Sequence, residues 1–143
     1  MKQKFNKSWK SSKQPRKQRK YLANAPLHTR RNFASVNLTK DLRKKYLLRN
    51  IVVRKNDVVK VMGGKFKKKQ GKVIKVDYTK NKVFIDGIQI KKQDGSKVNA
   101  PIQPSNLQIV ELNLEDKKRN NIVDRANKKK GENRPKSADL EKK

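Results

Sequence analysis

The sequence predicts a mainly β protein, a small β-barrel accompanied by a short helix and by basic arms at both ends. Only 32% of the 143 residues are hydrophobic and 37% are charged, which is too little apolar material for one core across the whole chain. Short runs rich in β-branched residues lie between positions 58 and 110, with turn signals between them. Lys and Arg crowd the segments on either side of these runs.

The charge is unevenly distributed along the chain. Residues 1–50 carry 16 basic and 1 acidic side chain, residues 51–112 carry 14 and 5, and residues 113–143 carry 11 and 6. We expect a basic extension over 1–37, a short amphipathic helix over 38–50, a barrel with an appended hairpin over 51–114, and a charged, largely disordered tail over 115–143.

The two arms show no sustained periodicity. Pro15 and Pro26 interrupt the basic runs of residues 1–37, so we expect this arm to be irregular until it meets its partner. In the tail, Ile122-Val123 is a weak helical patch, and the sequence from Asn127 onward is typical of disorder.

A helix is predicted between the arm and the barrel. Leu38, Leu42 and Tyr46 recur at a spacing of four, and Thr39 is suited to cap the first turn. Asp41 near the start and the basic residues near the end match the helix dipole.

Five strands and one tight hairpin are predicted for the barrel. The hairpin is indicated by Asp94-Gly95, with Lys91-Lys92 beside its basic tip. The strands are expected at Val58–Met62, Lys72–Val76, Lys82–Ile85, Ile88–Ile90 and Leu107–Val110.

The residue inventory argues against catalysis and against a bound cofactor. His28 is the only histidine and has no carboxylate near it in sequence, while the absence of cysteine leaves no ligand spacing for a metal. No apolar run approaches the roughly 18 residues of a membrane span. We expect no enzyme activity, no cofactor, no metal, no small-molecule substrate and no membrane span.

The charge predicts a polyanionic partner, and nucleic acid is the strongest candidate. There are 41 Lys and Arg against 12 Asp and Glu, a formal net charge of +29. Aromatic residues interleaved with the cations of the arm are suited to stack on unpaired bases. The predicted RNA-binding residues are Trp9, Lys10, Lys13, Arg16, Lys17, Arg19, Lys20, Tyr21, His28, Arg30, Arg31, Arg43, Lys44, Lys45, Arg49, Arg54, Lys55, Gly63, Gly64, Lys65, Phe66, Lys67, Lys68, Lys69, Gly71, Lys72, Lys91 and Lys92.

The glycine-rich lysine loop between the first two predicted strands is the strongest local signal. Gly63-Gly64 permits either a tight turn with positive φ or a close approach to an RNA backbone. A nucleotide-binding P-loop is excluded because Gly71-Lys72 is followed by Val73 and then by a strand.

The segment Asp57–Val76 resembles a KOW motif, and the flanks resemble the archaeal and eukaryotic branch of the universal large-subunit ribosomal protein twenty-four family. The flanking matches are Ser12–Tyr21 and, as the most specific string, Pro101–Asn106. The resemblance covers about residues 10–115, and it departs from the family at Lys68, where a glycine is usual.

The resemblance implies an SH3-like barrel in a structural constituent of the large ribosomal subunit. It implies binding to large-subunit rRNA near its 5′ end and near the polypeptide exit, a part in subunit assembly, and contacts with neighbouring ribosomal proteins and nascent-chain factors. It also implies a cytoplasmic location in the ribosome, with nucleolar assembly if the source is eukaryotic. The alternative is a KOW-domain transcription elongation factor that binds polymerase and nascent RNA.

Overall fold

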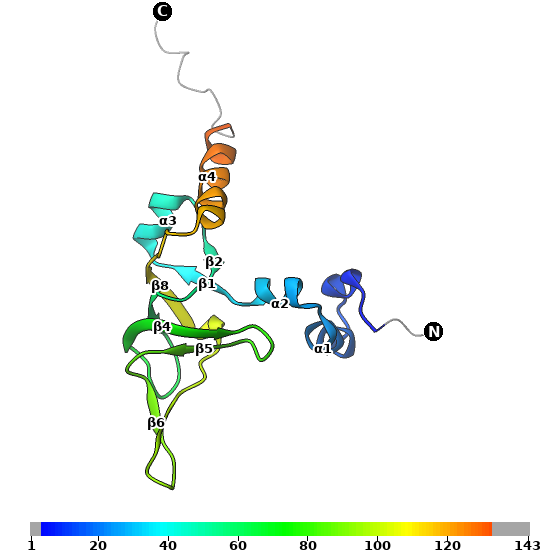
Figure 1. Ribbon diagram of the computed structural model, residues 1–143. Coiled ribbons are helices and arrows are strands. Elements are labelled where there is room, and N and C mark those ends of the chain that lie inside the picture. The colour runs from blue at the N-terminus through cyan, green and yellow to red at the C-terminus, as the bar shows by residue number, and fades with distance from the viewer. Residues whose placement is uncertain (1–3, 133–143) are drawn as a thin grey trace, which may run out of the picture.

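A computed structural model of the chain describes residues 4–132, with side chains to residue 127 (Figure 1). The helical elements are η1 (Lys7–Ser11), α1 (Pro15–Asn24), α2 (Leu27–Phe33), α3 (Lys40–Tyr46), η2 (Pro104–Asn106) and α4 (Lys117–Glu132). The strands are β1 (Ser35–Leu38), β2 (Asn50–Val52), β3 (Val58–Val61), β4 (Gln70–Asp77), β5 (Lys82–Ile85), β6 (Gln89–Lys91), β7 (Lys97–Asn99) and β8 (Leu107–Glu111).

The central unit is a six-stranded sheet in the order β2-β1-β8-β3-β4-β5. All its pairs are antiparallel except β1 with β8. The hairpin β6–β7 forms a separate two-stranded sheet, and Val83 of β5 makes an isolated antiparallel bridge to Ile102. The coarser expectation of a small, mainly β domain is therefore confirmed.

The hydrophobic core is built from the alternate residues of these strands that are buried. In β3, Val59 and Val61 are buried while Val58 and Lys60 are partly exposed, as expected when successive side chains point to opposite faces. The same cluster contains Val36 and Leu38 of β1 and residues of β4, β5 and β8. The five predicted strands are all present, as is the hairpin at Asp94-Gly95, where Gly95 has a φ of +85°.

The prediction of an irregular N-terminal arm is wrong. Pro15 occupies the first turn of α1, and Pro26 immediately precedes α2. The first turn is the one part of a helix that tolerates proline, because its N–H groups have no intrahelical acceptor. The residues that we interpreted as breaks are therefore helix starts. The arm continues into β1, which the sequence did not reveal.

The helix predicted for 38–50 is present as the shorter α3. The Thr39 hydroxyl accepts a hydrogen bond from the Leu42 N–H at 3.4 Å, as the capping pattern indicated. Leu38 belongs to β1, where it is fully buried. Leu42 and Tyr46 pack against the core, so α3 covers one end of the sheet.

The prediction of a largely disordered tail is wrong for its first half, which forms α4. Arg119 and Val123 of this helix are buried, although the segment is rich in polar residues. Both Arg119 terminal nitrogens donate to the Asp57 carboxylate, at 2.6 and 2.8 Å, and Asp57 is itself fully buried. Residues 133–143 of the predicted tail lie outside the described residues.

These elements place the basic segments on different sides of the sheet. In Figure 1 the arm formed by η1, α1 and α2 extends to one side, the β6–β7 hairpin projects from one end, and α3 and α4 lie at the other. The arm is anchored to the sheet through the pairing of β1 with β2 and β8.

Candidate nucleic-acid interface

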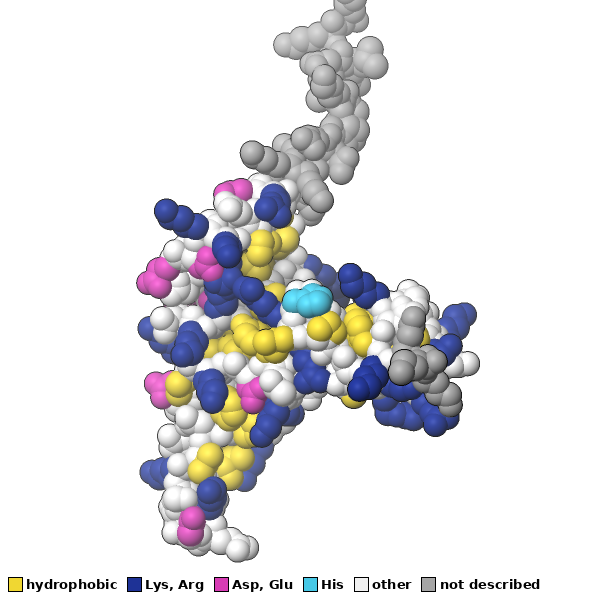
Figure 2. Space-filling view, turned by 45° about the vertical axis from the view of Figure 1, so that its right-hand side comes forward, with side chains coloured by type: hydrophobic (Ala, Val, Ile, Leu, Met, Phe, Trp, Pro, Cys, Tyr) yellow, Lys and Arg dark blue, Asp and Glu magenta, His cyan; other side chains and the backbone are white. Residues whose placement is uncertain are grey.

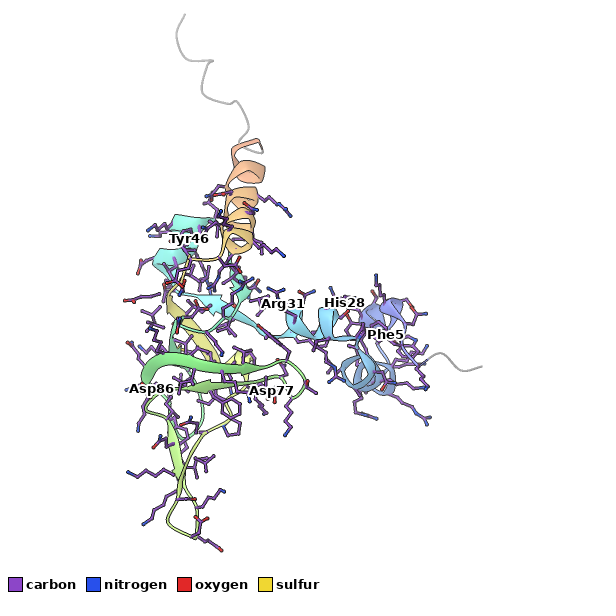
Figure 3. The ribbon with its side chains drawn as sticks, viewed as in Figure 1. Phe5, His28, Arg31, Tyr46, Asp77 and Asp86 are labelled. Carbon is purple, nitrogen blue, oxygen red and sulfur yellow. The ribbon has the colours of Figure 1, made fainter. Side chains whose placement is uncertain are left out.

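Basic side chains cover much of the surface of the described part of the chain. Figure 2 shows Lys and Arg gathered over the arm and along the body, with few acidic side chains between them on this face. In Figure 3, His28 and Arg31 lie on α2, and Phe5 lies further out on the arm. This distribution suits a long polyanion better than a compact ligand.

The outer arm is held together by one glutamine. The Gln18 side-chain amide on α1 donates to the carbonyl oxygens of Trp9, Lys10 and Ser12, at 3.1, 2.9 and 2.8 Å. These bonds fasten the η1 turn against α1. Gln18 was missed in the sequence because nothing in the local pattern distinguishes it from a solvent-facing residue.

Tyr21, which was predicted to stack on RNA bases, lies inside the arm. Tyr21 is only 8% exposed, and its ring packs on Phe5 at 5.4 Å and on Phe33 at 5.7 Å between centroids. These rings form a small aromatic cluster inside the arm, because the helices bring together residues that are far apart in an extended chain. Trp9 is outside this cluster and stays partly exposed.

Arg30, which was predicted to contact phosphate, has a structural role in the arm. Its guanidinium donates to the carbonyl oxygens of Ala23, Ala25 and Thr79, and the last of these bonds measures 2.9 Å. It therefore joins α1 and α2 to the turn between β4 and β5. The next residue, Arg31, is exposed.

The lysine loop between β3 and β4 is fixed by its own backbone and by one aromatic side chain. The Lys68 N–H donates to the Val61 carbonyl at 2.8 Å, and Phe66 packs against the core. Phe66 is therefore an anchor for the loop, in addition to its predicted role as an RNA contact. Exposed lysines surround it at Lys65, Lys67, Lys68 and Lys69.

The glycines of this region have different roles. Gly64 has a φ of +83°, as the turn interpretation predicted, whereas Gly63 has no positive φ. Gly71 also lacks a positive φ, but a Cβ there would lie 2.4 Å from the Asp86 carbonyl oxygen. The close approach of the chain after β5 therefore accounts for a glycine at position 71.

An open hollow of about 450 Å³, lined by basic side chains and by the acidic Glu115 and Asp116, lies where α2, the segment before β3 and the start of α4 meet. Arg31, Arg54 and Lys55 line it, and Arg54 also forms an ion pair with Asp116. Burial lowers the pKa of Arg54, and the nearby charges of Arg31 and Arg119 lower it further. An anion in this hollow would relieve that repulsion.

Most of the remaining predicted contacts are exposed, as an RNA-binding surface requires. Arg43 is an exception because its side chain donates to the Leu38 carbonyl at 2.8 Å. The exposed residues are Lys10, Lys13, Arg16, Lys17, Arg19, Lys20, His28, Lys44, Lys45, Arg49, Lys72, Lys91 and Lys92. They lie on the arm, on α3 and the connection that follows it, on β4 and on the hairpin, so they are spread over several elements.

Residues 4–132 contain no group of three or more His, Cys, Asp or Glu side chains placed to hold a metal ion. Within the same range, no helix has the length and apolar character to cross a membrane.

The fold and these surfaces define a small, strongly basic β protein with a helical arm suited to a nucleic-acid backbone. Residues 12–126 match the family that comprises the eukaryotic ribosomal proteins L26 and their archaeal L24 counterparts, and the chain belongs to this family. Over 114 residues it is 48% identical to the large ribosomal subunit protein uL24 of Methanosphaera stadtmanae, covering 80% of this chain and 97% of that protein. The chain is therefore a ribosomal protein and not an enzyme.

Proposed function

We propose that this protein is a structural constituent of the large ribosomal subunit that binds large-subunit rRNA near its 5′ end and near the polypeptide exit, and that it aids assembly of the subunit. The observation that carries the proposal is the family match across residues 12–126, which includes α1 and α2 of the arm, the lysine loop and the first part of α4. The relative named as a large-subunit protein aligns over nearly its whole length.

The geometry supports RNA as the direct partner. The arm, the lysine loop and the hairpin present exposed cations on separate elements, so one protein can touch several RNA segments at once. Neutralising phosphates with Lys and Arg releases counterions and reduces the repulsion between RNA strands. This is the property that a protein acting early in subunit assembly needs. Neighbouring ribosomal proteins and nascent-chain factors are further proposed partners, and nucleolar assembly is proposed for a eukaryotic source.

The SH3-like barrel implied by the KOW motif is part of the same proposal. The Val83–Ile102 bridge draws the outer strand β5 toward the segment before β8, which supports a curled sheet rather than a flat one. The β3–β4 loop that carries the lysines would then lie on the rim of the barrel.

Sedimentation of cell extracts tests the ribosomal role. We expect the full chain to comigrate with large subunits after a high-salt wash and to crosslink to the 5′ region of the large-subunit rRNA. Comigration with RNA polymerase instead would favour the transcription factor alternative. Crosslinks confined to other rRNA regions would overturn the proposed location while leaving the ribosomal role intact.

A further inference from the structure

We propose that the hollow between η1 and α1 binds a single unpaired nucleotide of RNA, with its base stacked on the Trp9 indole and the adjacent phosphates on Arg16, Lys17 and Lys20. This inference rests on the proposed rRNA binding and names the kind of RNA that the arm selects. It also assigns Gln18 as a positioning residue.

The hollow has the size and chemistry for a nucleotide. Its volume is about 550 Å³, within the range of roughly 300–1,000 Å³ that is usual for small-ligand sites. Trp9 and Ala23 provide apolar surface, while Arg16, Lys17, Arg19 and Lys20 provide cations, and no acidic side chain lines it. A flat aromatic ring surrounded by cations is the arrangement by which proteins hold a base and its phosphates.

Trp9 is available for such a contact. It does not belong to the hydrophobic core or to the Phe5–Tyr21–Phe33 cluster, and its side chain is partly exposed. The Lys20 ammonium lies 5.5 Å from the centroid of its ring. Such a contact is weak at an exposed site, so a stacked base can replace the ammonium and leave Lys20 for a phosphate.

The position of Trp9 is set before RNA arrives. Gln18 bonds the carbonyl oxygens of Trp9, Lys10 and Ser12, and because an amide has two N–H groups at least one bond is shared. The Ser12 N–H also donates to the Trp9 carbonyl at 3.1 Å. A fixed backbone lowers the ordering cost of binding, which favours a defined site over a loose charged arm.

The ligand must be unpaired. Inside an A-form duplex both faces of each base are covered by its neighbours, and the deep major groove is too narrow for side chains to read. A nucleotide in a loop, bulge or single strand exposes a face that the indole can reach.

Trp9 is the only tryptophan of the chain, so its fluorescence reports on the site directly. The probe is an oligouridylate of about ten nucleotides, a length within the footprint of single-strand binders. We expect its binding to the full chain to quench the emission, and a fully paired RNA stem of equal phosphate number to leave the emission unchanged. Unchanged emission at saturation with the oligouridylate would overturn the proposal.

Variants separate stacking from charge. Trp9→Ala should weaken oligouridylate binding by about 5- to 150-fold, the usual range for the loss of one stacked base, and Trp9→Phe should recover much of that loss. Gln18→Met keeps the size and neutrality of the side chain and preserves the helix. It should weaken oligouridylate binding without changing the slope of log affinity against log salt. Lys13 is a cation outside the hollow and provides the control. Trp9→Ala should cause the same loss of affinity in the Lys13→Ala chain as in the parent chain.

An abasic oligonucleotide gives the decisive comparison, because it offers the phosphates without the bases. The parent chain and Trp9→Ala should bind it equally well. If they also bind the oligouridylate equally while both still bind large-subunit rRNA, the nucleotide site is wrong and the proposed function stands. If the parent chain fails to bind that rRNA at all, the proposed function fails.

Discussion

Gly71 is the residue at which a single methyl group should have the largest effect on the fold. A Cβ there would lie 2.4 Å from the Asp86 carbonyl oxygen and 2.8 Å from Ile85 Cγ2. The Asp86 backbone cannot move away freely because its N–H donates to the Lys72 carbonyl at 2.9 Å. We expect Gly71→Ala to reduce the free energy of unfolding by about 1–3 kcal/mol, the usual cost of overpacking.

Gly63→Ala is the matched control, since a Cβ at that position meets no atom within 4 Å and the residue has no positive φ. Urea denaturation of both variants and the parent chain measures the difference. Equal urea midpoints for Gly71→Ala and Gly63→Ala would contradict this prediction. They would show that β5 and the turn after it can shift to accommodate the added methyl group.

Lys68 carries backbone strain that a glycine would remove. Its φ is +73°, in the left-handed region that lysine rarely occupies. Lys68→Gly should raise the free energy of unfolding by about 0.5–1 kcal/mol relative to Lys67→Gly, which removes the same charge without relieving strain. Thermal melts of the two variants test this, and a less stable Lys68→Gly would contradict it.

At the scale of elements, α4 depends on one buried ion pair. Arg119 and Asp57 are 1% and 0% exposed, so removing the guanidinium leaves a buried carboxylate that keeps only the N–H donors of Arg54 and Asn113. Arg119→Met should reduce the free energy of unfolding by about 3–5 kcal/mol, as for other buried pairs that lose one partner. Amide exchange should rise first in α4.

Arg125→Met removes an exposed arginine from the same helix and is the matched control. It should change stability by less than about 0.5 kcal/mol, the usual range for surface positions. Similar losses for both variants would mean that general charge on α4, and not the pair with Asp57, holds the helix in place.

Arg30 and Arg31 are adjacent in the arm, and we expect their substitution to have different effects on RNA binding and on stability. Arg31→Met should reduce the slope of log affinity against log salt by about one phosphate contact, because Arg31 is exposed. Arg30→Met should leave the slope unchanged and instead increase amide exchange in α1 and α2, since it removes the bond to Thr79. A reduced slope for Arg30→Met would show that Arg30 leaves its carbonyl partners to contact RNA.

At the scale of the whole molecule, a net charge of +29 should make RNA affinity strongly dependent on salt. If about 6–10 phosphates are contacted, raising monovalent salt from about 50 to 200 mM should weaken binding by roughly 10³–10⁵. Filter binding to a large-subunit rRNA fragment measures this, with melting curves over the same salt range as the control for folding. A nearly flat dependence would mean that most cations remain solvated when RNA is bound.

The sequence by itself determined the features that depend on local pattern. The β-branched runs, the Asp94-Gly95 turn and the Thr39 cap each act over a few residues, and each is present in the structure. The motif and its flanks likewise indicated the family, which the match over residues 12–126 confirms.

Only the tertiary structure decided which charged and aromatic residues are free to meet a partner. Tyr21, Arg30 and Arg119 lie in segments that resemble solvated basic tracts, yet each is occupied by residues distant in sequence, such as Phe5, Thr79 and Asp57. Short strands such as β1 and β2 also gain their stability from their neighbours in the sheet rather than from their own composition. Long-range packing therefore separates the residues that build the arm from those that stay exposed to a partner.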